Sequence, residues 1–498
     1  MTRVGFLSLH SHGDRSFLDD SALALAAGRA RRRGDDARLV LVALDGRAPD
    51  VAATAGFAAL VAALRGFDVI VYERVWTRAI PAALVAALPD AVVVHWRGEH
   101  ALDDPPGGYQ VETRALPDLL DHLAGRRPSL PVGAHARTAV GWRPGLGALA
   151  APVDRAYVPE LAPLVVNPDG LPAERVLSID GNAGCPYQAD ARANPRYAGV
   201  AIPDGIGRGC AFCTTGNHYE ARPQAETIAA VLEQLTYARR EAPALTRLVL
   251  RDQNPFGYLA ELLEQCAATG VGGFTLLLQT RADWLLAGER RLQRALDAAA
   301  RAGITITPFL VGIESFSQDE LDRLNKGVTV AQNLALLAAL RRWDAHPAFD
   351  LAHASFGFIL FTPWTTLADL RAAYDGIVAT ELDRLRGRLL TARVRLYPDT
   401  ALYYLAAHDG LLADLGASPQ PERFGYFPDR AWRFRDPVVA RFAALAAAAS
   451  DASHGRDERQ VFRALLEVFA ESDGSSATVA DVLARATPPA PTRATPAP

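Results

Sequence analysis

Three of the four cysteines in this 498-residue chain lie in one short window. Cys210 and Cys213 form a C-x2-C pair, and Cys185 precedes Cys210 with 24 residues between them. All three follow a strand expected at 175–180. Thiolates at such spacings bind zinc or an iron–sulfur cluster. The fourth cysteine, Cys266, lies on the apolar face of an expected helix and is interpreted as a core residue.

The residue types leave two kinds of metal site open. Three thiolates can hold a [4Fe–4S] cluster and leave one iron free for a substrate or cofactor. A zinc ion could instead recruit His218 as a fourth ligand, in the pattern C-x24-C-x2-C-x4-H. The zinc alternative describes a non-catalytic metal-binding protein with a degenerate barrel. A thioredoxin-like redox pair is disfavoured, because such sites have no third cysteine.

The cysteines belong to a second series of alternating strands and helices, at 175–400. Six βα units without a reversal signal predict a (β/α)6 partial barrel. The carboxyl ends of the strands, where the cysteines fall, form the catalytic face of such a barrel. The expected strands are 175–180, 246–252, 274–280, 306–313, 354–360 and 392–398, and the expected helices are 224–240, 258–268, 288–302, 329–342 and 366–385.

A first α/β series occupies residues 1–150. Its apolar strands alternate with helices, which predicts a doubly wound parallel sheet covered on both faces. Residues 151–174 are a Pro-rich connector, 401–485 a helical region, and 486–498 a Pro-rich tail expected to be disordered. The expected strands of the first series are 4–9, 37–44, 67–75 and 91–96, and its helices are 19–33, 52–65 and 79–87.

Composition excludes several classes of protein. The chain has 52 basic and 56 acidic residues, a net charge of −4. That balance argues against a nucleic-acid or anionic-membrane binder, and the basic run 29–33 is interpreted as a solvated helix end. Four cysteines exclude a disulfide scaffold. With no signal-peptide pattern and no apolar run of membrane-spanning length, we expect a soluble cytoplasmic protein.

The cysteine window resembles that of the radical SAM superfamily. That family holds a [4Fe–4S] cluster on three cysteines after the first barrel strand, usually as C-x3-C-x2-C. Here Gly184-Cys185-Pro186-Tyr187 resembles the start of the motif and Cys210-Ala211-Phe212-Cys213 its end. Ile206 stands where the first cysteine would fall. The simplest interpretation is an insertion of about 21 residues, which costs little loop-closure entropy.

Four later segments resemble the same family in the same order. They are 246–256, 273–284, 311–329 and 354–366, and the third, VGIESFSQDELDRLNKGVT, is the strongest match. The fifth-strand segment lacks the glycine and acid common there. The resemblance implies S-adenosylmethionine (SAM) contacts from Asp252, Asn254, Arg281, Glu314 and Ser315, with Phe212 packed near the cluster and the adenine.

The resemblance also implies a reaction and its partners. An electron from the reduced cluster would cleave SAM and generate a 5′-deoxyadenosyl radical, which abstracts hydrogen from a substrate. The protein would orient the reactants and exclude water. The implied partners are a small-molecule or peptide substrate and a reductase or flavodoxin-type electron donor, with no nucleic acid and no membrane.

An α/β domain ahead of the barrel resembles the cobalamin-binding subgroup of that family. Residues 91–124 look like the last strand and closing helix of such a domain. The motif Asp-x-His-x-x-Gly, whose histidine ligates cobalt, is matched at His10 and Gly13 but has Ser8 in place of the aspartate. Two interpretations follow. Bound cobalamin would support methyl transfer or rearrangement in specialised metabolism, whereas a domain that has lost the cofactor would accompany simple hydrogen abstraction, epimerisation or cyclisation.

Overall fold

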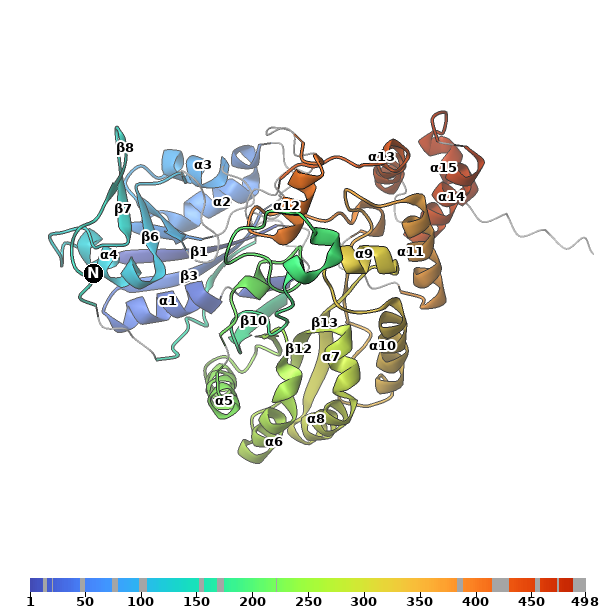
Figure 1. The fold of residues 1–498 in the computed structure, drawn as a ribbon. Coiled ribbons are helices and arrows are strands. Elements are labelled where there is room, and N and C mark those ends of the chain that lie inside the picture. Colours follow the sequence, from blue (N-terminus) through green and yellow to red (C-terminus); the bar gives the residue numbers. More distant parts are fainter. Residues whose placement is uncertain are drawn as a thin grey trace, which may run out of the picture.

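The computed structural model contains two sheets built mainly from parallel strands, each flanked by helices (Figure 1). Their strands pack near-continuous apolar runs against helices on the sheet faces, as buried parallel strands require. The structure describes residues 1–11, 16–19, 21–44, 50–73, 79–97, 105–151, 156–167, 174–220, 222–382, 388–413, 430–452, 457–472 and 474–486.

The first sheet has eight strands in the order β8-β7-β6-β5-β4-β1-β3-β9. The strands from β6 to β9 through β1 are parallel, whereas β7 and β8 add an antiparallel hairpin at one edge. The order reverses at β1, which is where open α/β sheets bind ligands. The strands are β1 Arg3–Ser11, β3 Asp36–Leu44, β4 Val69–Tyr72, β5 Val92–Arg97, β6 Tyr109–Glu112, β7 Ala134–Thr138, β8 Gly141–Pro144 and β9 Leu164–Val166.

Helices cover both faces of this sheet. On one face α1 (Ser21–Arg32) and α4 (Leu116–Leu123) bury Leu23 and Leu119 against the strands. On the other face, α2 (Ala55–Leu64) and α3 (Ala79–Ala87) form a second apolar layer. The doubly wound domain expected from the sequence is therefore confirmed.

The second sheet has six strands in the order β14-β13-β12-β11-β10-β2, all parallel. One apolar side chain from each of four strands forms a small separate cluster: Val176, Val249, Leu277 and Phe309. The strands are β2 Ser16–Asp19, β10 Glu174–Asp180, β11 Arg247–Arg251, β12 Phe274–Arg281, β13 Ile304–Glu314 and β14 Phe356–Phe358. The helices between them are α5 Gln224–Glu241, α6 Leu259–Thr269, α7 Ala282–Ala287, α8 Glu289–Ala302, α9 Gln318–Arg323, α10 Val330–Trp343 and α11 Leu367–Ala379.

The edges of the second sheet differ in detail from the expectation. The segment 392–398 makes only single bridges, Phe361 to Arg393 and Leu396 to Arg430, instead of a sixth strand. The short strand β2, from the N-terminal part of the chain, pairs with β10 at the opposite edge. The first domain thus contributes a strand to the partial barrel.

Four helices follow β14 and α11 in the described ranges, within the region expected to be helical. The helices are α12 Ala401–His408, α13 Pro437–Ala452, α14 Glu458–Glu471 and α15 Val479–Ala486. They share the apolar core of the barrel through Phe442 and Phe462. The expected boundaries at 150, 174, 400 and 485 stay predictions, and the tail 487–498 lies outside the described residues. No helix in the described ranges is long and apolar enough to cross a membrane.

Candidate metal and cofactor site

The cysteine loop follows β10, and the long gap between its first two cysteines is closed in space. The backbone N–H of Gly209 donates to the carbonyl of Ala189 at 2.9 Å, and Asp190 pairs with Arg208 in an antiparallel bridge. Residues 190–208 therefore form a lobe whose two ends meet. If the 21 residues from Ala189 to Gly209 are left out of the count, three residues remain between Cys185 and Cys210. The cysteines then have the spacing C-x3-C-x2-C.

Hydrogen bonds outside the lobe hold both ends of the cysteine loop. The N–H of Cys185 donates to Thr215, at 3.1 Å, and the Gln188 side chain donates to the carbonyl of Cys185 at 2.7 Å. At the other end, Asn325 Nδ2 donates to the carbonyl of Gly209 at 2.8 Å. The backbone around the thiols is thus fixed by the fold.

The three thiols of the loop belong to one electrostatic neighbourhood, since Cys213 interacts with both Cys185 and Cys210. Burial raises the pKa of Cys185, and it raises that of Cys210 to about 11. No three His, Cys, Asp or Glu side chains within the described ranges are grouped tightly enough to hold a single metal ion. His218 is exposed.

Arg281, at the end of β12, lies against the cysteine loop. Its Nη1 donates to Cys210 Sγ at 3.2 Å, and its Nε donates to Asp283 at 3.1 Å. Its guanidinium carbon lies 3.7 Å from the ring centroid of Tyr187 and 5.1 Å from that of Trp284. With 6% of its side chain exposed, Arg281 is a buried cation held between two aromatic rings.

Glu314, at the end of β13, pairs with Lys326. The Lys326 Nζ to Glu314 Oε1 distance is 2.9 Å, and both side chains are buried. Glu314 has φ of +61°, a left-handed conformation that non-glycine residues adopt at a cost and often at functional sites. A Cβ at Gly312 would come within 2.4 Å of Glu314 Oε1 and 2.5 Å of Lys326 Nζ, so the pair fits only over a glycine.

Asp252 and Asn254, after β11, differ in their surroundings. The Asp252 carboxylate accepts hydrogen bonds from the backbone and side chain of Asn182, the backbone of Asn254 and the hydroxyl of Tyr258, at 2.8–3.1 Å. It therefore orders the strand ends. Asn254 Oδ1 is buried without a hydrogen-bond partner in the described part of the chain. A buried polar atom in that state is expected to meet a ligand or water.

The other residues expected at the site also lie at this end of the sheet. Ser315 is buried, and its Oγ accepts from the N–H of Ser317 at 3.0 Å. Phe212 is partly buried against the barrel core, with its ring centroid 5.9 Å from Lys326 Nζ. The structure thus brings the cysteines, Arg281, Glu314 and Phe212 into one connected group.

In the first domain, the strand-end loops that would contact cobalamin lie largely outside the described residues. These are 12–15, 45–49, 74–78 and 98–104, which follow β1, β3, β4 and β5. His10 is described and partly buried, and its Nε2 lies 3.0 Å from Ser8 Oγ. Ser8 therefore contacts the histidine from the position where the motif has an aspartate.

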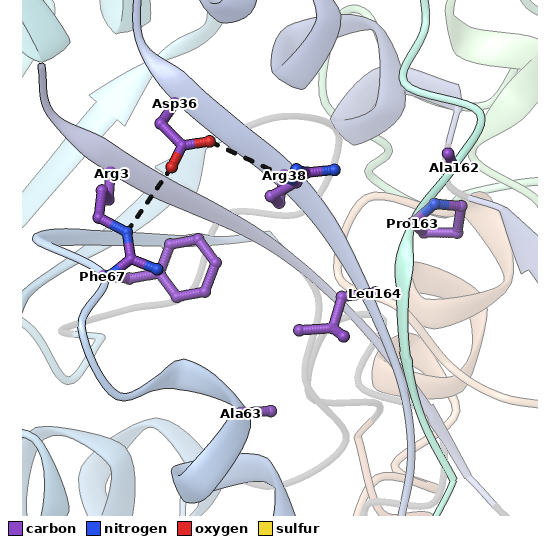
Figure 2. A pocket seen from close by; sticks show the side chains of 8 residues that line it. All are labelled: Arg3, Asp36, Arg38, Ala63, Phe67, Ala162, Pro163 and Leu164. Atoms are coloured by element: carbon purple, nitrogen blue, oxygen red, sulfur yellow. Dashed lines mark ion pairs between the residues drawn. The ribbon is translucent and has the colours of Figure 1, made fainter.

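One cavity of the first domain lies at the end of the sheet opposite the loops that would contact cobalamin. It has a volume of about 350 Å³ and is lined by Arg3, Asp36, Arg38, Ala63, Phe67, Ala162, Pro163 and Leu164. Arg3 and Asp36 open β1 and β3, so the cavity lies at the amino ends of the strands (Figure 2). Its acid is already engaged, since Asp36 pairs with Arg3 at 3.7 Å and with Arg38 at 4.0 Å.

One residue of the site, Lys326, was missed from the sequence. A signal for it was present, because Lys326 is the only lysine among the 52 Lys and Arg residues of the chain. Tyr187, which belongs to the start of the cysteine motif, stacks on Arg281 and donates through its hydroxyl to the carbonyl of Asn325 at 3.0 Å.

Comparisons with known proteins identify the fold. No family model matches the sequence, and no curated protein matches it. Among solved structures, the cobalamin-dependent S-adenosylmethionine radical enzyme OxsB, with aqua-cobalamin and S-adenosylmethionine bound, matches at TM-score 0.58 and 13% identity. That match covers 94% of this chain and 71% of the other.

Two further structures of OxsB give the same result. The form with aqua-cobalamin alone matches at TM-score 0.59 and 12% identity, covering 97% of this chain and 79% of the other. The apo, selenomethionine-labelled form matches at TM-score 0.58 and 15% identity, covering 92% and 67%. At these identities the likeness establishes the fold. The chain has the fold of a cobalamin-dependent radical SAM enzyme, as the resemblances of the cysteine window and of the first α/β domain had implied.

Proposed function

We propose that this chain is a radical SAM enzyme, with Cys185, Cys210 and Cys213 as the three protein ligands of a [4Fe–4S] cluster. The observation that carries the proposal is the closed base of the 190–208 lobe, where Gly209 bonds to Ala189. This closure supports Cys185 as the first ligand despite the atypical spacing. Each thiolate of a cluster binds a different iron, so three separated thiols suit a cluster better than one ion.

SAM would bind beside the cysteines at the strand ends. Asn254 offers the unpaired Oδ1, and Glu314 and Ser315 lie on the adjoining strand end. Asp252 is assigned a positioning role, because its carboxylate is already occupied by protein donors. When bound, the cluster supplies the electron that cleaves SAM and yields a 5′-deoxyadenosyl radical. The barrel residues hold SAM and the substrate and exclude water.

Cobalamin is the third cofactor that we propose, in the first domain. The support is the domain's flavodoxin-like strand order and the bound cobalamin of two structures that share the fold. With cobalamin the reaction is methyl transfer or rearrangement of a small molecule or peptide. Electrons would come from a reductase or flavodoxin-type donor.

Metal analysis of cysteine variants tests the proposal. The chain is purified without oxygen, and iron, sulfide, zinc and cobalt are counted before and after addition of cobalamin. We expect about four irons per chain, lost in Cys185→Ala, Cys210→Ala and Cys213→Ala. Cys266→Ala is the matched control, because Cys266 is buried in the core on α6, and it should keep its iron.

Two results would contradict the proposal. Full iron content in Cys185→Ala would exclude the insertion interpretation. A colourless protein with one zinc would favour the non-catalytic alternative. Binding of iron without binding of cobalamin would limit the proposal to a radical SAM enzyme with a first domain that has lost its cofactor.

A further inference from the structure

Lys326 is the only lysine in a chain that uses arginine at every other basic position. It is also buried, with 4% of its surface exposed. Arginine and lysine differ in shape, since a guanidinium is a broad planar fork and an ammonium a compact point charge. The single lysine places a compact cation directly over Gly312, where the absence of a side chain leaves room for the ammonium.

The backbone around Lys326 is shaped to place that ammonium. Asn325 and Gly327 on either side have φ of +48° and +65°. A Cβ at Gly327 would lie 2.3 Å from the hydroxyl of Tyr187, so the turn also packs tightly against the cysteine loop. This turn directs Lys326 Nζ toward Glu314, with the ring of Phe212 alongside.

Two buried cations consequently lie against the cysteine loop. Arg281 donates a hydrogen bond to Cys210 Sγ, and its Nη2 donates to the backbone carbonyl of Lys326 at 2.5 Å. Lys326 Nζ lies 5.9 Å from the ring centroid of Phe212, the residue between Cys210 and Cys213 in the loop.

Each of the two cations also has a carboxylate partner in the described part of the chain. Arg281 is paired with Asp283 and Lys326 with Glu314. Thiolate ligands add negative charge at this position, and the two cations lie beside it. Buried charges interact strongly because little water screens them.

We propose that the two buried cations beside the cysteine loop, Arg281 and Lys326, act as positioning residues that raise the reduction potential of the cluster. This inference rests on the proposed function. Reduction adds one negative charge to the cluster, which nearby cations and hydrogen bonds to the ligand sulfur stabilise. Removal of either cation should therefore make the cluster harder to reduce.

The experiment measures the midpoint potential of the anaerobically reconstituted holoenzyme by redox titration monitored by electron paramagnetic resonance. The variants are Arg281→Gln and Lys326→Met. The matched control is Arg251→Gln, because Arg251 ends the neighbouring strand β11 but contacts Ser21 and Asp180 of the domain junction. We expect unchanged iron content and a shift to more negative potential in both test variants, with Arg281→Lys shifted less than Arg281→Gln. The control should match the wild type.

A second measurement uses the wild-type sequence and needs no folding-competent variant. Lysine labelled with ¹³C at Cε gives a single lysine resonance from the entire chain. We expect the paramagnetic reduced cluster to broaden or shift this resonance, and the Cys210→Ala chain to lack the effect. This readout decides the question if Lys326→Met loses its iron.

The outcomes separate this inference from the proposed function. An unchanged midpoint potential in either variant at full iron content would overturn the proposed role of the two cations and leave the radical SAM assignment intact. A lysine resonance that is insensitive to a bound cluster would do the same. A wild-type chain that binds no iron would overturn both.

Discussion

The imidazole of His95 is fully buried at the end of β5, with its ring centroid 5.2 Å from that of Tyr72. Neither ring nitrogen makes a hydrogen bond of ordinary geometry to the described residues. Burial, with a smaller contribution from Arg97, lowers the pKa of His95 to about 4. The folded chain therefore holds this ring neutral at pH values where an unfolded histidine is already protonated.

This burial predicts a specific loss of stability in acid. As the pH falls from 6.5 to 4, the unfolded chain binds a proton at His95 before the folded chain does, so stability falls across that window. The loss is about 3 kcal/mol by linkage. Thermal unfolding at a series of pH values should show a weaker acid dependence for His95→Phe than for the wild type.

An exposed histidine provides the control for that measurement. His218 lies at the surface, so His218→Phe should keep the acid dependence of the wild type. Equal pH dependence in His95→Phe and the wild type would show that the buried ring is not the source.

At the same scale, residue identity singled out the proposed ligands but not their neighbours. The rarity of cysteine was enough to single out Cys185, Cys210 and Cys213. The position of Arg281 at a strand end was also predictable, but its hydrogen bond to Cys210 was not, because that contact joins residues 71 positions apart. Lys326 could have been found from its uniqueness in the composition.

The lobe at 190–208 is the element on which the assignment of Cys185 depends. Besides the hydrogen bond that closes its base, side chains of the lobe bind it to the barrel. Asn194 and Arg196 contact α9 at Asp322 and Asp319, and Tyr197 is buried with its hydroxyl donating to Arg323. These contacts stabilise the lobe against the barrel, whereas the cysteine backbone is held by Thr215 and Asn325.

Replacement of the lobe tests whether residues 190–208 are needed for the three cysteines to bind the cluster. A two-residue Asn-Gly turn in place of 190–208 would keep the Gly209 to Ala189 hydrogen bond as the closing bond of a hairpin turn. We expect this variant to bind as much iron as the wild type but to unfold at a lower temperature, because the packing of Tyr197 is lost. A folded variant without iron would show that the lobe itself shapes the site.

Element prediction succeeded where periodicity is long and failed at short strands. Helices such as α5 and α8 were expected within a few residues of their observed bounds, because both have clear apolar faces. β2 was missed because four residues carry no periodic signal, and its partner β10 lies more than 150 positions away. The irregular segment 392–398 was expected as a strand from its alternating pattern, yet its backbone bonds are divided between 360–361 and 430.

At the scale of the whole molecule, the two α/β units are interlocked. β2 leaves the first domain to pair with β10, and Ser21 Oγ, at the start of α1, donates to Asp180 at 3.3 Å. Arg251 Nη1 completes the junction by donating to Ser21 at 3.2 Å. The strand ends of both sheets are thereby tied together, which suits a reaction that uses a ligand from each domain.

Two-domain architecture followed from the alternation of strands and helices, but cofactor occupancy of the first domain did not. The loops that would decide it are short, polar and outside the described residues, and His10 carries a serine neighbour in place of the usual carboxylate. Cobalt content therefore has to be measured.

Release of 5′-deoxyadenosine from SAM tests the proposed chemistry most directly. The reconstituted chain is incubated anaerobically with SAM and dithionite, and the nucleoside products are separated by chromatography. We predict 5′-deoxyadenosine from the wild type and from Cys266→Ala, and none from Cys210→Ala. A wild-type protein that carries a full complement of iron and leaves SAM intact under these conditions would contradict the assignment as a radical SAM enzyme.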